Sequence, residues 1–196
     1  MVDHYFSKKP TSALRIKPIE LNLLDMDFTF DTASGVFAVG KLDRGTELLI
    51  KSIDSKGGKL LDLGCGYGAV GVTLSVFFDE VYMVDVNERA VAVSKRNKKR
   101  NKCKNCIVLQ SDGFSAVEGK KFDVIATNPP THAGKKLIFS WIEQIKSYLA
   151  PKGAFYLVCK TKLGAKSYEA KIQEEFGNCE TIKKGSGYRV FRAINL

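Results

Sequence analysis

Short apolar runs alternate with longer segments of helical periodicity along most of this chain. Strands are predicted at residues 59–63, 81–84, 106–110, 122–126 and 154–160. Helices are predicted at residues 69–78, 88–101, 136–149 and 165–176, with Asn87 as the N-cap of the second. Strands and helices that alternate in this way imply right-handed βαβ crossovers, and therefore a doubly wound parallel sheet.

The start of the chain carries a different pattern. Polar and apolar residues alternate over residues 19–30 and 35–39, which predicts an antiparallel hairpin with its turn at residues 31–34. Thr46 is expected to cap a helix that extends to Ile53. These elements precede the first strand of the predicted sheet.

The end of the chain predicts a second hairpin. Residues 178–183 and 188–194 flank a turn with two glycines, so the last strand is expected to run antiparallel. The expected fold is α/β and Rossmann-like, with a mostly parallel seven-stranded sheet and an N-terminal β-hairpin extension. One domain is expected over residues 1–196, divided into an extension at 1–53 and a cofactor-binding core at 54–196.

Composition narrows the class of protein. The hydrophobic fraction of 44% and the charged fraction of 27% are typical of a soluble globular protein. No apolar run approaches the ~20 residues that a membrane helix needs. Residues 1–20 hold no continuous apolar segment of the kind found in export signals. We therefore expect a cytoplasmic protein without membrane contact.

The strand at residues 59–63 leads into a glycine-rich loop. The loop region contains Asp62, Gly64, Cys65, Gly66 and Gly68. Glycines at alternate positions imply backbone with positive φ, or a ligand pressed against bare backbone. A nucleotide-like cofactor suits such a loop, although an ordinary strand-to-helix turn is the alternative. The spacing also satisfies the dinucleotide fingerprint, which leaves NAD open.

Two further acidic residues follow predicted strands. Asp85, followed by Val86, ends the second strand, 19 residues after Gly66, where an acid can accept hydrogen bonds from a ribose. Asp112, followed by Gly113, comes after the third strand and could accept from an adenine amino group. Both aspartates could instead serve as turn or helix-capping residues. In this sheet type the carboxyl ends of the strands meet at one edge, where ligands bind.

The fourth strand ends in Asn128, Pro129 and Pro130. Two successive prolines fix a rigid turn, and a plain turn is one interpretation. The other interpretation concerns amino nitrogens. The Asn128 side-chain oxygen and the Pro129 carbonyl could accept the two N–H bonds of an amine and direct its lone pair at a methyl donor. This interpretation needs no strong base.

Taken together, these residues resemble motifs I to IV of class I S-adenosylmethionine-dependent amino-methyltransferases. Residues 34–37, 41–46, 132–134 and 188–193 further resemble the "methyltransferase small" family. That family includes the catalytic half of bacterial 16S rRNA guanine-N2 methyltransferase C and single-domain archaeal relatives. The resemblance implies S-adenosylmethionine as cofactor and guanine N2 of ribosomal RNA as target.

The resemblance also implies roles for single residues. Cofactor contacts fall on Asp62, Gly64, Cys65, Gly66, Gly68, Asp85, Val86, Asp112, Gly113 and Asn128, and catalysis falls on Asn128, Pro129 and Pro130. One position departs from the pattern, because Thr131 stands where relatives have an aromatic residue. Stacking on the target base is then expected from His132, Phe37 or Tyr5.

Charge indicates a polyanionic partner. The formal net charge is +10, and residues 95–104 hold seven cations without an acid. Lys98, Lys99 and Arg100 are candidate phosphate contacts, with a solvated helix end as the alternative. The partner predicted is RNA, most specifically small-subunit rRNA.

Two other functions and two structural questions stay open. The first function is a non-catalytic RNA-binding module on the same fold, and the second is methylation of adenine N6 or of a protein glutamine. Five cysteines are present, and Cys103 and Cys106 have no second pair nearby, so no metal is expected. The oligomeric state is either a monomer or a homodimer.

Overall fold

The computed structural model describes residues 8, 13–130 and 134–196. Within these residues one sheet has seven strands, in the order β5-β4-β3-β6-β7-β9-β8. The strands are β3 (Lys59–Leu63), β4 (Glu80–Asp85), β5 (Cys106–Gln110), β6 (Phe122–Thr127), β7 (Leu149–Lys160), β8 (Glu180–Gly185) and β9 (Tyr188–Ile194). β5, β4, β3, β6 and β7 pair in parallel, and β9 is antiparallel to both its neighbours. The predicted fold class is confirmed.

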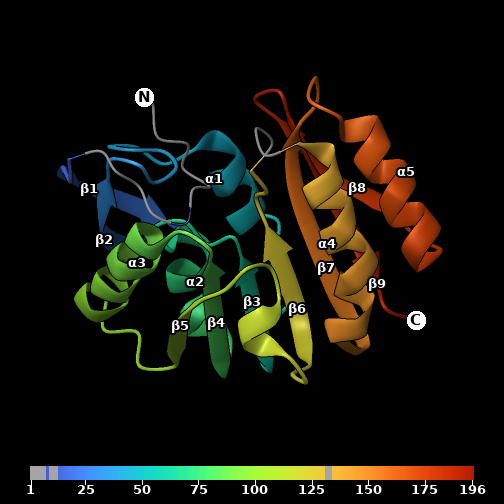
Figure 1. The fold of residues 1–196 in the computed structure, drawn as a ribbon, viewed down its shortest axis with the longest axis horizontal. Coiled ribbons are helices and arrows are strands. Elements are labelled where there is room, and N and C mark those ends of the chain that lie inside the picture. The colour runs from blue at the N-terminus through green and yellow to red at the C-terminus, as the bar shows by residue number, and fades with distance from the viewer. Residues whose placement is uncertain (1–7, 9–12, 131–133) are drawn as a thin grey trace.

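Helices cover both faces of this sheet (Figure 1). They are α1 (Arg44–Ile50), α2 (Ala69–Leu74), α3 (Glu88–Arg100), α4 (Lys135–Tyr148) and α5 (Ala165–Phe176), with short 3-10 turns at Ser75–Phe77 and Ser115–Val117. Side chains alternate along a strand, so Leu60 packs in the core beneath α2 and α3 while Leu61 packs beneath α4 and α5. Among the described residues, no helix is long and apolar enough to cross a bilayer.

The N-terminal hairpin exists, but its turn was predicted at the wrong place. β1 (Ile16–Leu23) pairs with β2 (Met26–Ala33), and the turn falls on Leu24 and Asp25, with φ values of 51° and 61°. Residues 31–33, where the turn was expected to begin, form the end of β2, and residues 35–39 form a loop. The polar residues Asp31 and Thr32 misled the prediction because both are buried.

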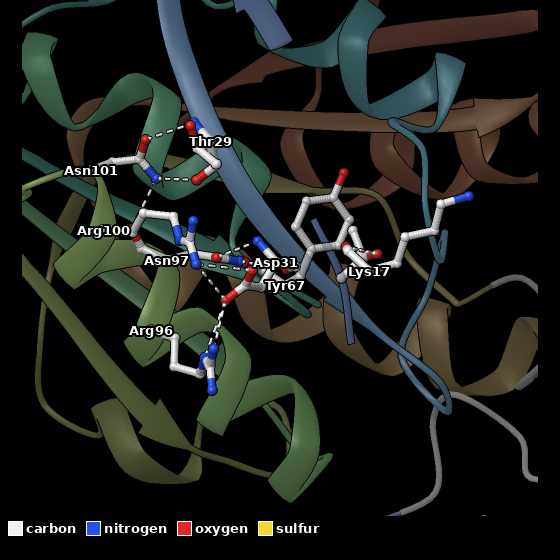
Figure 2. A network of polar contacts seen from close by, with 9 residues as sticks. Lys17, Thr29, Asp31, Tyr67, Arg96, Asn97, Arg100 and Asn101 are labelled. Carbon is white, nitrogen blue, oxygen red and sulfur yellow. Dashed lines mark hydrogen bonds and ion pairs between the residues drawn. The ribbon is translucent and has the colours of Figure 1, made fainter. Parts of the chain in front are cut away.

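Asp31 is buried because α3 supplies its partners (Figure 2). Its carboxylate forms ion pairs with Arg96 at 3.0 Å and Arg100 at 3.3 Å. The Asn97 carboxamide accepts from the Asp31 backbone N–H at 2.7 Å and donates to its carbonyl at 2.9 Å. The Asn97 nitrogen also donates to the Tyr67 carbonyl in the glycine loop at 2.8 Å. We call these residues the Asp31 network; it joins the hairpin, α3 and the glycine loop.

Candidate functional site

A cavity of about 370 Å³ lies at the carboxyl ends of the parallel strands. The predicted residues that line it are Phe37, Asp62, Gly64, Cys65, Gly66, Asp85, Val86, Asp112, Gly113, Asn128, Pro129 and Pro130. Gly68 does not line it and instead precedes α2 as its N-cap, with φ of 87°. The cavity is where a doubly wound sheet places its ligand. The binding roles of these residues remain predictions.

The glycine loop exposes backbone to the cavity. Gly64 and Cys65 both donate their N–H groups to the Val84 carbonyl at 2.9 Å, which joins the loop to β4. Gly64 and Gly66 have φ values of 72° and 57°, which side chains other than glycine rarely adopt. A Cβ built on Gly66 would meet no atom within 4 Å. A ligand can therefore lie directly against this part of the loop.

Two carboxyl groups stand beside that loop, the buried Asp62 and the half-buried Asp85. Asp85 accepts from the Gly66 N–H on one oxygen and from the Asn87 N–H on the other, each at 2.9 Å. Burial raises the Asp85 pKa to about 6, and the backbone hydrogen bonds oppose that rise. Burial likewise raises the Asp62 pKa to about 7, against the N–H bond from Gly71. Each oxygen of Asp85 keeps acceptor capacity for a ligand hydroxyl.

Asn128 follows β6 and has its side chain oriented by α1. Its nitrogen donates to Asp43 Oδ2 at 3.1 Å and to Thr46 Oγ1 at 2.9 Å. Both amide hydrogens are thereby engaged, and Asp43 can only accept. In the part of the chain that the structure describes, Asn128 Oδ1 accepts no hydrogen bond. The oxygen is thus the group that Asn128 offers to a ligand.

Asp43 also caps α1, a role that was wrongly predicted for Thr46. Asp43 Oδ2 accepts the Thr46 N–H at 3.0 Å, and α1 ends at Ile50 instead of residue 53. Its other oxygen accepts the Tyr188 hydroxyl at 3.0 Å. We call Asp43, Thr46, Asn128 and Tyr188 the Asp43 cluster. Residues that are distant in sequence thereby determine the orientation of one carboxamide at the cavity.

The sequence of this chain matches a known protein family. Residues 27–192 match the model described as "Methyltransferase small domain". The chain belongs to the methyltransferase small domain family. It is 38% identical to "Uncharacterized protein YbxB" of Bacillus subtilis, over 98% of each chain. It is 34% identical to ribosomal RNA small subunit methyltransferase C of Pseudomonas entomophila, over 98% of this chain and 58% of that protein.

A solved structure resembles this methyltransferase small domain along most of its length. It is the T. thermophilus 16S rRNA N2 G1207 methyltransferase (RsmC) in complex with AdoMet and guanosine. The TM-score is 0.86 and the identity 30%, over 95% of this chain and 52% of that chain. The chain therefore spans about half the length of the methyltransferase C relatives that it matches.

S-adenosylmethionine is the cofactor of this methyltransferase fold, and the residues present fit it. Asp85, with its two backbone donors, suits a ribose diol. The bare backbone at Gly66 leaves room for the ligand where a Cβ would otherwise stand. The carboxyl groups of Asp62 and Asp85 at the cavity suit a cofactor that carries positive charge.

Among the lining residues that sequence reasoning missed are two apolar residues that α4 contributes to the cavity wall. Leu137 and Trp141 of α4 line it. Trp141 Cη2 would lie 3.5 Å from a Cβ on Gly64, and Trp141 Nε1 would lie 3.2 Å from one on Gly113. Helical periodicity predicted a helix at residues 136–149. It gave no sign that one face of this helix turns toward a ligand, because the approach of α4 to the two loops is a tertiary contact.

The predicted substrate contacts fall in three places. Phe37 lines the cavity, whereas Thr131, His132 and Tyr5 lie outside the described residues. The basic candidates do not line the cavity, and two of them contact their own chain. Lys98 donates to the Cys106 carbonyl, Arg100 pairs with Asp31, and Lys99 is exposed.

Proposed function

We propose that this protein transfers a methyl group from S-adenosylmethionine to an exocyclic amino group, specifically guanine N2 of small-subunit ribosomal RNA in the cytoplasm. The observation that carries the proposal is the orientation of Asn128. Its nitrogen is held by Asp43 and Thr46, so its oxygen remains as an acceptor at the cavity. An exocyclic amine can donate two N–H bonds to acceptors at this position, whereas a hydroxyl target has only one O–H bond to donate.

The chain's own residues perform the orienting chemistry. S-adenosylmethionine supplies, when bound, an activated methyl group on a positively charged sulfur. The Asn128 oxygen and the Pro129 carbonyl accept the two N–H bonds of the target amine. This contact localises the nitrogen lone pair, which in a base is delocalised into the ring, and directs it at the methyl group. The successive prolines keep the carbonyl in a fixed turn, so both acceptors are in place before the target arrives.

Phe37 is the aromatic residue that we assign to the target base. It lies in the loop between β2 and α1 and lines the same cavity as Asn128 and Pro130. Half-buried aromatic rings at such positions provide a stacking surface for an unpaired base. Phe37→Leu should therefore raise the KM for RNA more than it lowers turnover at saturating RNA.

Guanine is favoured over the other amines by the similarity to RsmC, whose structure is named for N2 of G1207 and holds guanosine. RNA as the partner is further supported by the net charge of +10. Adenine N6 and a protein glutamine present a similar planar amine and are the competing targets.

One labelling experiment tests the proposal. The protein is incubated with isotopically labelled S-adenosylmethionine and, in separate reactions, 16S rRNA transcript, small subunits and tRNA. The products are digested and identified by mass spectrometry. We expect labelled N2-methylguanosine from a small-subunit substrate, with Asn128→Ala as the inactive control. Labelled N6-methyladenosine or methylglutamine would replace the proposed target, and no product despite cofactor binding would support the binding module.

A further inference from the structure

A second hollow lies next to the Asp43 cluster. It has a volume of about 410 Å³ and is lined by Lys160, Thr161, Lys162, Ser186, Gly187 and Tyr188. We call it the Lys160 groove. One wall is the end of β7 and the loop before α5, and the other is the turn between β8 and β9. The Thr161 N–H donates to the Gly187 carbonyl at 2.8 Å, which holds the two walls together.

Tyr188 connects the Lys160 groove to the catalytic end of the cavity. Its ring lines the groove, and its hydroxyl donates to Asp43, which in turn holds Asn128. α1 packs on the same ring, since a Cβ on Gly45 would stand 2.6 Å from Tyr188 Cε1. The groove therefore lies next to the position proposed for the target amine at Asn128.

The loop that leads from the groove into α5 lies against the start of α4. Lys135, the first residue of α4, donates to Ser167 at 3.2 Å, just beyond the β7–α5 loop. Its Cε would lie 3.3 Å from a Cβ on Gly164 of that loop. The start of α4, which follows the cavity residues 128–130 in the chain, is thus close to the β7–α5 loop that begins at the groove.

The lysines of the groove are available to a ligand. Lys160 and Lys162 are exposed, and neither forms an ion pair with any residue that the structure describes. Lys160 Nζ lies 6.0 Å from the centre of the Tyr188 ring. On α3, in contrast, Arg96 and Arg100 are paired with Asp31. Free positive charge near the cavity is therefore found in the groove, in addition to the exposed Lys8 of the cavity wall.

We propose that the Lys160 groove binds the phosphodiester backbone of RNA next to the target nucleotide, an inference that rests on the proposed function. Two unpaired ammonium groups attract phosphates and release their counterions. The exposed hydroxyls of Thr161 and Ser186 can donate to phosphate oxygens. Contacts of this kind position a strand without reading its sequence, while Asn128 selects the amine.

The test compares two double variants that lose the same charge. Lys160→Gln with Lys162→Gln alters the groove. Lys56→Gln with Lys152→Gln removes two exposed lysines near the amino ends of β3 and β7, at the opposite edge of the sheet. Binding of a 16S rRNA transcript is measured by fluorescence anisotropy between 50 and 200 mM salt, and methylation is measured on the same samples.

We expect the groove variant to lower the slope of log affinity against log salt by about 1.5, because each lost phosphate contact contributes roughly 0.7 to 0.9. KM for RNA should rise while turnover at saturating RNA stays near that of the wild type. The control variant should keep the wild-type slope. An unchanged slope in the groove variant, or an equal loss in both variants, overturns the groove assignment. Absence of methylation by the wild type, with RNA binding intact, counts against the proposed function instead.

Discussion

Asp31 and Asp43 show how one residue type serves two purposes in this methyltransferase small domain. Asp31 is 2% exposed and pairs with two arginines from α3. Asp43 is half-buried at the edge of the cavity and accepts from neutral donors, among them Asn128 and Tyr188. The first carboxylate holds one element against another, and the second orients a side chain that lines the cavity.

The two aspartates differ in whether the side chain that donates to them also lines the cavity. Arg96 and Arg100 contact Asp31 without reaching the cavity, so these ion pairs stabilise the docking of the hairpin on α3. The Asn128 nitrogen that meets Asp43 belongs to a group whose other end is available at the cavity. Changes in the Asp31 network should therefore alter stability, and changes in the Asp43 cluster should alter turnover.

Asn128→Ala should produce the largest effect. Removal of a preorganised polar group at the reacting centre commonly costs about 10²–10³ in rate. We expect that loss in single-turnover methylation, with the dissociation constant for S-adenosylhomocysteine within about twofold of wild type, measured by calorimetry. Near-wild-type methylation by the alanine variant would reduce Asn128 to a turn residue and end the contrast with Asp31.

Asp43→Ala should have the next largest effect, a rate loss of about 10- to 100-fold, because the carboxamide loses one of its two constraints. Asp43→Asn is the matched variant. Its side-chain oxygen can still accept from Asn128 and Thr46, and its nitrogen can donate to Tyr188, so most of the rate should return. Single-turnover methylation rates, measured after chemical quenching, compare the two variants. Equal losses in both variants would show that the charge of Asp43, and not its geometry, is what matters.

Asp31→Ala should destabilise the fold by about 1 to 2 kcal/mol, since Arg96 and Arg100 lose the acceptor that they share while both stay partly exposed to water. Urea denaturation measures the change. Arg96→Gln is the control and should cost under about 1 kcal/mol, because the arginine side chain is 56% exposed and Arg100 stays in place. Methylation per folded molecule should be preserved in both. A large loss of turnover without a loss of stability would contradict the division of roles.

Cofactor affinity should show the smallest effect, a dependence on pH. In the proposed role of Asp85, ribose hydroxyls bind its ionised form, and burial raises the pKa of this carboxyl to about 6. S-adenosylhomocysteine should therefore bind up to about tenfold more weakly at pH 5 than at pH 7.5. Calorimetry across this range tests it, with Asp85→Asn as the variant that should lose the part of the dependence that comes from Asp85, while Asp62, whose pKa is raised to about 7, still titrates at the cavity.

Stability of the ligand-free protein should respond to pH with the opposite sign. Burial raises the pKa of Asp62 to about 7 and of Asp85 to about 6, above the ordinary value of 3.8. The folded state then binds more protons than the unfolded chain between about pH 4 and pH 7. The contribution of these two groups to the free energy of unfolding is present in full below pH 4 and is lost as the pH rises through 6 and 7.

The parallel core could be predicted because its signals are local. Five apolar runs, four of them followed by a helical segment, became β3 to β7 with bounds close to those expected, apart from a longer β7. The turn of the N-terminal hairpin could not, because its sequence signal was misleading. Leu24 and Asp25 adopt positive φ without a glycine. Asp31 looks like a turn residue until α3 brings arginines to it.

The candidate site divides in the same way. The glycine loop, Asp85 and the Asn128 turn follow strands directly, so their common position at one sheet edge could be predicted. The orienting role of Asp43 could not, because its partners Asn128 and Tyr188 lie 85 and 145 residues away in the chain. Residues 41–46 did carry a signal, since they belong to the family resemblance, but the pattern gave Asp43 no chemical task.

A double-mutant cycle between Asp43 and Asn128 tests the central claim most directly. Single-turnover methylation is measured for Asp43→Ala, Asn128→Ala and the double variant at saturating cofactor and RNA. If Asp43 acts by orienting Asn128, its removal has nothing left to disturb once the carboxamide is gone, and the double variant should match Asn128→Ala within about twofold. A further loss of tenfold or more in the double variant would show that the two residues act independently, and would contradict the account.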